Sequence, residues 1–153
     1  MRTRKKLILN LGGFLMEIDF DKMQGLVPAV VQDEGNGELL MVGFMNREAL
    51  HMTLHTGFVT FYSRTREKLW TKGETSGNRL QVITAATDCD RDTVLLRVRV
   101  LGEGKVCHKG TRSCFTEPLP LGAAAIGPAL FEQSGSNPTR LAPENPAASR
   151  AKQ

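Results

Sequence analysis

All three cysteines of the chain, Cys89, Cys107 and Cys114, lie within one stretch, DCDRDTVLLRVRVLGEGKVCHKGTRSCF (88–115). Three thiols cannot all pair within one chain, and the basic and then apolar N-terminus is broken by polar and glycine residues without a cleavage site. An odd count without a convincing signal peptide favours reduced thiols and a cytoplasmic protein. The chain therefore depends on an apolar core, which 153 residues with 41% hydrophobic side chains can supply.

The charge of the chain is mildly basic, with a formal net charge of +4. Such a balance favours phosphate-bearing partners without demanding nucleic acid. Aromatic residues make up only 6% and show no repeated pattern with basic residues, so a base-stacking platform is not indicated. Apolar runs are too short to span a membrane. We expect neither a nucleic acid nor a membrane as partner.

The first half of the chain predicts a hairpin followed by a helix. LVPAVVQ (26–32) and ELLMVGFM (38–45) are typical of strands, and DEGNG (33–37) is typical of the turn between them. Pro28 would place the first strand at an edge, because proline donates no ladder hydrogen bond. NREALHMTLHTG (46–57) predicts the helix, with an asparagine to cap its start and a glycine to end it.

The second half predicts strands at 58–63, 79–90 and 93–101, with a polar loop over 64–78. After Phe115 the composition shifts to proline, alanine, glycine and serine. We expect an α+β fold of mainly antiparallel strands with one or two short helices. The predicted organisation is a flexible extension (1–15), a compact single domain (16–117) and a Pro/Ala-rich tail (118–153).

The cysteine spacing, C-x17-C-x6-C, indicates a candidate zinc site. Thiolates suit zinc, and catalytic zinc sites keep three protein ligands and leave the fourth place to water. Cys89, Cys107 and Cys114 without a fourth cysteine fit that open kind, although His108 could close the site. The alternative is that the three cysteines are simply buried apolar side chains.

Asp88, Asp90 and Asp92 surround Cys89. In an extended segment these carboxylates would project to one face, and Cys89 would point the other way. Oxygen ligands of this kind suit magnesium, and the alternative is a solvated acidic turn. Whether Cys89 then reaches the zinc of its own chain stays open, and a thiolate donated across a dimer interface is possible.

His108, beside Cys107, is a candidate general base, because three anionic thiolates leave a zinc-activated water in need of one. In the polar loop SRTREKLWTKGETSG (63–77), guanidinium groups, hydroxyls and glycine amides are typical phosphate-binding parts. The alternative interpretation is that residues 63–77 form an exposed charged loop without a ligand.

Together, QD (32–33), GFMNREAL (43–50), FYSRTREKLWTKGETSGN (61–78), DCDRD (88–92) and CHKGTRSCF (107–115) resemble the phosphoribosyl-AMP cyclohydrolase family of histidine biosynthesis. The resemblance runs in order from about Leu26 to Phe115. Two positions depart from the family pattern: Gly43 stands where alanine is usual, and Asn78 where histidine is frequent.

The resemblance implies a homodimeric enzyme that hydrolyses the N1–C6 bond of the adenine ring in 1-(5-phosphoribosyl)-AMP, giving the formimino imidazole carboxamide ribotide. It implies zinc on Cys107, Cys114 and a Cys89 donated by the other subunit of an intertwined dimer. It implies magnesium on Asp88, Asp90 and Asp92. It places substrate and phosphate binding on Ser63, Arg64, Arg66, Trp70, Lys72, Glu74, Thr75 and Ser76.

A competing function is a zinc-stabilised basic module that binds nucleic acid. The missing fourth zinc ligand, the acidic triplet and the scarcity of aromatic residues disfavour it.

Overall fold

The computed structural model describes residues 7–11 and 14–121. The chain divides into two units between Glu117 and Pro118, and every helix and strand of the described residues belongs to the first. In chain order these elements are β1 (Leu7–Leu11), β2 (Phe14–Ile18), β3 (Val27–Asp33), β4 (Leu39–Met45), α1 (Arg47–Thr56), β5 (Thr60–Ser63), β6 (Lys68–Thr71), β7 (Leu80–Thr87) and β8 (Val94–Val100).

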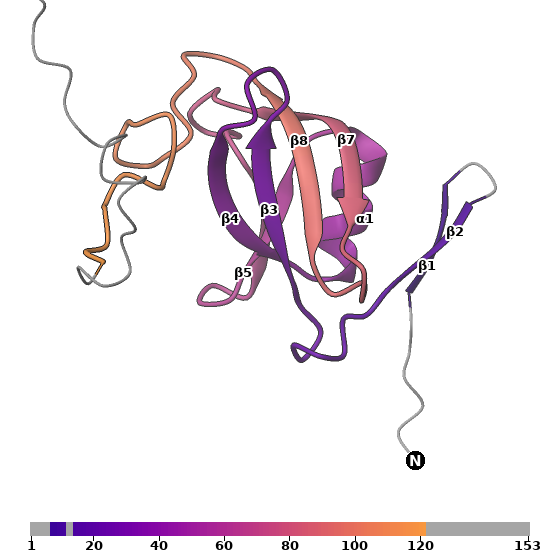
Figure 1. Cartoon of the computed structure of the whole chain (residues 1–153). Coiled ribbons are helices and arrows are strands. Elements are labelled where there is room, and N and C mark those ends of the chain that lie inside the picture. The colour runs from indigo at the N-terminus through magenta and orange to yellow at the C-terminus, as the bar shows by residue number, and fades with distance from the viewer. Residues whose placement is uncertain (1–6, 12–13, 122–153) are drawn as a thin grey trace, which may run out of the picture. The chain divides into compact units, whose positions relative to one another are not determined.

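The predicted α+β class is confirmed: most strand pairs are antiparallel, and the described residues contain one helix. Four strands form the main sheet in the order β4-β3-β8-β7 (Figure 1). β3 is antiparallel to β4 and parallel to β8, and β7 is antiparallel to β8. β1 pairs with β2, and β5 pairs with β6, as two separate hairpins. No helix in this part of the chain is both long and apolar enough to cross a membrane.

One face of the sheet forms the core. Ala29 and Val31 of β3 and Leu96 and Val98 of β8 are fully buried, and Figure 1 shows α1 behind the sheet. Because side chains alternate along a strand, the intervening residues project from the opposite face. There the register aligns four apolar residues that are not buried, one from each strand: Val42, Val30, Leu95 and Ala86.

Helix α1 begins and ends where its sequence predicts. The side chain of Asn46 accepts a hydrogen bond from the backbone amide of Ala49 at 2.8 Å, which satisfies one of the free amides of the first turn. Gly57 ends the helix in the left-handed conformation with φ 75°, which costs glycine little. Leu50 is buried against the core.

Two expectations about strands are wrong. β3 is a central strand, not an edge. Its proline is tolerated because the ladder to β8 begins only at Ala29, one residue after Pro28. The polar loop 64–78 contains an unpredicted strand, β6, which pairs with β5 from Thr60↔Thr71 to Ser63↔Lys68.

The predicted ends of the chain overlap only partly with the described residues. The extension 1–15 includes β1 and the start of β2, whereas residues 1–6 and 12–13 lie outside the described part. Most of the predicted tail, residues 122–153, also lies outside it. The proposed domain boundaries therefore stay predictions.

Candidate active site

Cys107 and Cys114 lie in the loop that follows β8. A tight turn encloses the first of them: the amide of Gly110 donates to the carbonyl of Cys107 at 2.9 Å, and the amide of Cys107 donates to the carbonyl of Thr111 at 3.0 Å. Gly110 has φ 84°, a conformation open to glycine. The turn brings Cys107 close enough to Cys114 for each thiol to affect the pKa of the other.

The two thiols differ in acidity. Hydrogen bonds from the backbone amide of Lys109 and the side chain of Thr111 lower the pKa of the Cys107 thiol. Partial desolvation of the otherwise exposed Cys114 raises the pKa of its thiol, and so does its interaction with Cys107, while the charge of Lys72 acts in the opposite direction. Of the two thiols, that of Cys107 is therefore the more readily deprotonated. Such a thiolate beside a thiol is a suitable start for binding a soft cation.

His108 adjoins this pair and is exposed. Its Nδ1 lies 3.9 Å from the Sγ of Cys107. The positive charge of Lys72, in the segment after β6, opposes the rise in the pKa of the Cys114 thiol from a distance. The structure therefore brings Cys107, Cys114 and His108 together.

Cys89 lies elsewhere in the same chain. It is exposed in the turn between β7 and β8, and among the described residues it forms no three-residue group of metal ligands with the other cysteines. That turn precedes Val94, which pairs with Ala29 near the start of β3. Cys114 is attached to the start of β4, where its amide donates to the carbonyl of Leu40 at 2.8 Å. The two regions belong to opposite ends of the sheet.

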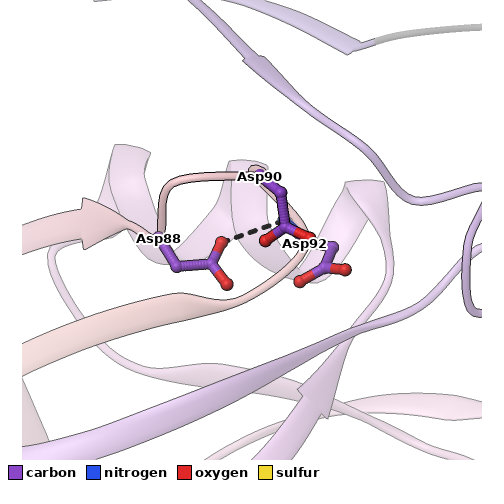
Figure 2. Close-up of side chains that lie close together, drawn as sticks. All are labelled: Asp88, Asp90 and Asp92. Atoms are coloured by element: carbon purple, nitrogen blue, oxygen red, sulfur yellow. Dashed lines mark hydrogen bonds between the residues drawn. The ribbon is translucent and has the colours of Figure 1, made fainter.

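Asp88, Asp90 and Asp92 come together, each with a carboxylate oxygen within 4.8 Å of the others. Figure 2 shows them at the turn between β7 and β8. The expected extended conformation is wrong. Oδ1 of Asp88 accepts from the amides of Asp92 and Thr93, both at 3.1 Å, and Arg91 has φ 64°. The carboxylates therefore converge through a turn, because the first of them holds the backbone of the last.

An ammonium group already occupies this cluster. Nζ of Lys22 lies 2.6 Å from Oδ2 of Asp90 and 2.9 Å from Oδ2 of Asp92. Hydrogen bonds to Asp90 and then Asp92 raise the pKa of Lys22 above its ordinary value. Lys22 thus places one positive charge beside two of the three carboxylates. Nothing in the sequence near Lys22 indicated this pairing across 68 positions.

The β5–β6 hairpin carries a pocket of about 350 Å³, lined by Ser63, Thr65, Arg66, Lys68 and Trp70. Ser63, Arg66 and Trp70 were predicted for substrate binding, and the hydroxyl of Thr65 belongs to the predicted phosphate-binding loop, whereas Lys68 was not predicted. The ring of Trp70 packs on Phe61 with centroids 5.2 Å apart. A cationic wall beside an aromatic ring suits a phosphorylated heterocycle.

The other predicted substrate residues lie outside this pocket. The guanidinium of Arg64 lies over the ring of Phe44 at 3.9 Å. Glu74, Thr75 and Ser76 lie in the turn after β6.

Comparison with known proteins covers the segment that holds these groups. A family model described as phosphoribosyl-AMP cyclohydrolase matches residues 41–116. The phosphoribosyl-AMP cyclohydrolase of Solibacter usitatus is 55% identical over 107 residues, which cover 70% of this chain and 84% of that protein. The enzyme of the same name from Trichlorobacter lovleyi is 55% identical over 101 residues, or 66% of this chain and 80% of that protein.

The chain belongs to the phosphoribosyl-AMP cyclohydrolase family. A further relative, the histidine biosynthesis bifunctional protein HisIE of Escherichia coli K12, is 56% identical over 99 residues, which are 65% of this chain and 48% of that protein. Membership in a family of hydrolytic enzymes favours the enzyme over the nucleic-acid-binding alternative. The segment matched by the cyclohydrolase family model contains all three cysteines, His108 and the aspartates.

At Gly43 and Asn78, where the sequence predicts departures from the family pattern, the structure of this cyclohydrolase shows specific contacts. A Cβ added to Gly43 would lie 2.4 Å from the ring of Phe61. Asn78 is buried, and its Oδ1 accepts from the amide of Glu103 at 2.8 Å. That bond links the turn after β6 to the turn after β8, which leads into the cysteine loop.

Proposed function

We propose that this chain hydrolyses the N1–C6 bond of the adenine ring of 1-(5-phosphoribosyl)-AMP in histidine biosynthesis. The observation that carries the proposal is the thiol pair Cys107 and Cys114, with His108 beside it, inside the segment that matches the cyclohydrolase family. Soft ligands next to a base suit the hydrolysis of an electron-poor purine carbon, as in zinc deaminases.

The donor set fits zinc. Two adjacent thiols, one with a lowered pKa, supply part of a soft tetrahedral site. Within this site zinc would supply Lewis acidity to the water that attacks C6. His108, exposed beside Cys107, would take a proton from that water and deliver it to N1 as the ring opens.

The third thiolate is proposed to come from Cys89 of a second copy of the chain. Ala29 marks the end of the sheet near the Cys89 turn, because it pairs with Val94. Gln32 marks the end near the Cys114 loop, because it pairs with Leu39. These two residues are three positions apart on β3, which corresponds to about 10 Å. Two sulfurs on one zinc lie within about 4.6 Å of each other, twice the Zn–S distance. One subunit therefore cannot bring Cys89 to the pair without rearrangement, whereas a homodimer can.

The open face of the sheet supports such a dimer. Val42, Val30, Leu95 and Ala86 form an apolar row across all four strands, and Val42 is 44% exposed. Exposed apolar surface of this kind commonly marks an interaction site. We assign the second subunit to this face.

Magnesium is proposed at Asp88, Asp90 and Asp92. The oxygens of the three carboxylates converge, as the ligands of a hard cation do, and two of the carboxylates already hold the positive charge of Lys22. Asp88, Asp90 and Asp92 would hold the magnesium, which would supply positive charge to offset that of the substrate phosphates. Arg66 and Lys68 would bind phosphate in the pocket, and Trp70 offers a ring face to the base.

An absorbance assay with phosphoribosyl-AMP tests the proposal. The purine absorbance should change as the ring opens, the change should stop when a chelator removes zinc, and it should return when zinc is added back. Ring opening at an undiminished rate in zinc-free protein would contradict the zinc assignment. Binding of nucleic acid without any turnover of phosphoribosyl-AMP would favour the competing function.

A further inference from the structure

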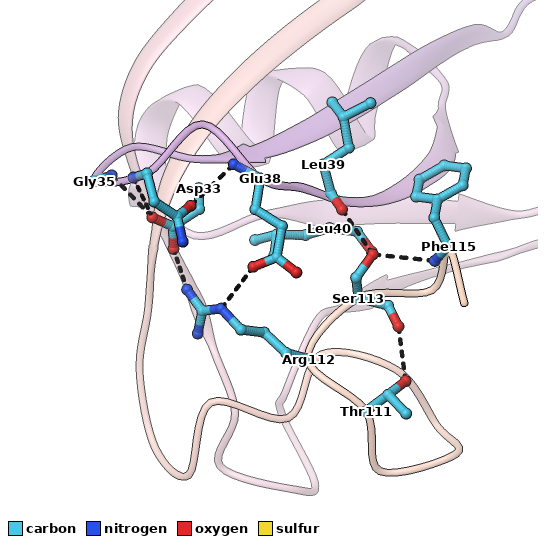
Figure 3. Close-up of polar contacts among 10 residues, drawn as sticks. Asp33, Gly35, Glu38, Leu39, Leu40, Thr111, Arg112, Ser113 and Phe115 are labelled. Atoms are coloured by element: carbon cyan, nitrogen blue, oxygen red, sulfur yellow. Dashed lines mark hydrogen bonds and ion pairs between the residues drawn. The ribbon is translucent and has the colours of Figure 1, made fainter. Parts of the chain in front are cut away.

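Arg112, two residues before Cys114, ties the cysteine loop to the β3–β4 hairpin. Figure 3 shows its guanidinium between two acidic side chains. One terminal nitrogen donates to Oδ2 of Asp33, and Nε donates to Oε2 of Glu38 at 2.9 Å. The planar guanidinium thus spans both ends of the hairpin turn, which a lysine ammonium cannot do in the same geometry.

Asp33 is a fixed anchor. Its side chain is only 12% exposed, and its Oδ1 accepts from the amides of Gly35 at 2.9 Å and Asn36 at 3.1 Å. Its backbone amide donates to the carbonyl of Glu38 at 2.8 Å. Its carbonyl accepts from the amide of Gly37 at 3.0 Å. Because the turn engages the amide, the carbonyl and Oδ1 of Asp33, the remaining oxygen, Oδ2, is presented to Arg112 at a defined position.

The residues after Arg112 continue the attachment. Oγ of Ser113 donates to the carbonyl of Leu39 at 2.7 Å, and the amide of Cys114 donates to the carbonyl of Leu40 at 2.8 Å. The loop contains no helix or strand, and between residues 102 and 115 only Val106 and Cys107 are buried. Val106 packs in the core, whereas the part of the loop after Cys107 depends on these few polar contacts for its position.

We propose that Arg112 is a positioning residue, which holds Cys114 at the start of β4 through its ion pair with Asp33 and so sets the metal affinity of the thiol pair. The inference rests on the proposed zinc site. An exposed ion pair contributes little to stability, but this one has a buried partner and lies two residues from a proposed ligand. Outer residues that orient metal ligands commonly affect metal affinity without touching the metal.

The test measures zinc affinity by competition with a chromophoric chelator, and the thiolate-to-metal absorption of the cobalt-substituted protein. Arg112→Gln should weaken zinc binding by roughly 10- to 100-fold, with a shifted cobalt spectrum. Asp33→Asn should behave similarly, and the double variant should be little worse than either single one, because both changes break the same contact. Lys105→Gln is the matched control: it removes a charge from the same loop, but its ion pair with Glu103 stays within that loop, so zinc affinity should not change.

Wild-type zinc affinity in Arg112→Gln would overturn the inference. If that variant does not fold, Arg112→Lys decides. This variant keeps the positive charge but lacks the planar guanidinium that donates to both Asp33 and Glu38, so it should fold and still bind zinc more weakly than the wild type. An unchanged zinc affinity would again overturn the inference. A wild-type chain that binds no zinc at all would instead refute the proposed function, so the two failures can be told apart.

Discussion

Gly43 of β4 lies directly against the ring of Phe61. A Cβ atom added to Gly43 would lie only 2.4 Å from carbon atoms of that ring. Phe61 is buried, and its other neighbour is Trp70 at the pocket. The glycine therefore lets the aromatic ring of Phe61 fill the space beside β4. Gly43 thus packs on Phe61, and Phe61 packs on Trp70, which lines the proposed substrate pocket.

Gly43→Ala should destabilise the protein by about 1–3 kcal/mol, because overpacking displaces the Phe61 ring. The fluorescence of Trp70, the only tryptophan, should shift as its neighbour moves. Chemical denaturation with fluorescence detection measures both effects. In the background of Phe61→Leu the same substitution should cost much less, and an equal cost in both backgrounds would contradict the packing argument.

His108 is predicted to act on protons and not to hold zinc. His108→Ala should retain zinc near the wild-type stoichiometry and lose turnover by roughly 10²–10⁴-fold, the range for a removed general acid–base group. Added imidazole should restore part of the rate. His51→Ala, on the exposed side of α1, serves as the control. Loss of zinc in proportion to activity would make His108 a ligand or the support of one.

At the residue scale, the sequence predicted the groups whose chemistry is local and missed those that depend on tertiary contact. The cysteine–histidine dipeptide and the alternating aspartates can be read from neighbouring letters, and the carboxylates do converge. Lys22 and Arg112 meet their partners across 68 to 79 positions. No pattern within either segment specifies such a partner, because folding alone brings the two together.

At the element scale, the same distinction separates the helix from the strands. α1 carries its own start and stop signals, Asn46 and Gly57, and its bounds were predicted almost to the residue. β6 has only four residues between polar turns. It is a strand because of its pairing with β5, including the contact between the hydroxyls of Thr60 and Thr71 at 3.0 Å. Strand preference depends on such neighbours more than on the segment itself.

The turn between β7 and β8 yields a prediction about metal binding. Lys22 competes with any divalent cation for Asp90 and Asp92, so Lys22→Met should tighten magnesium binding by roughly two- to five-fold, a modest change because the pair is partly exposed. Calorimetric titration with magnesium, or with manganese as a probe, measures the constant. Lys105→Gln removes a distant lysine and should leave the constant unchanged. Weaker binding in Lys22→Met would mean that the lysine supports the carboxylates rather than competing with the metal.

At the scale of the whole molecule, the proposed site is divided between the two ends of one sheet. The turn with Cys89 and the loop with Cys107 and Cys114 belong to opposite ends of β3 and β4. Two copies related by a two-fold axis can bring the ends together twice, because an isologous interface repeats each contact. Such an arrangement makes two equivalent sites per dimer, each built from both chains.

Subunit mixing tests this division. Cys89→Ala and Cys107→Ala homodimers should each be inactive, because every site lacks one thiolate. In a mixed dimer, one site combines the intact Cys89 of one chain with the intact Cys107 and Cys114 of the other, and the second site lacks both. After full exchange in an equal mixture, half the dimers are mixed, so activity and bound zinc should return to about a quarter of the wild-type value. Native mass spectrometry verifies exchange through a mass tag on one variant. Verified mixed dimers without recovered zinc or turnover would show that each site is built within one chain.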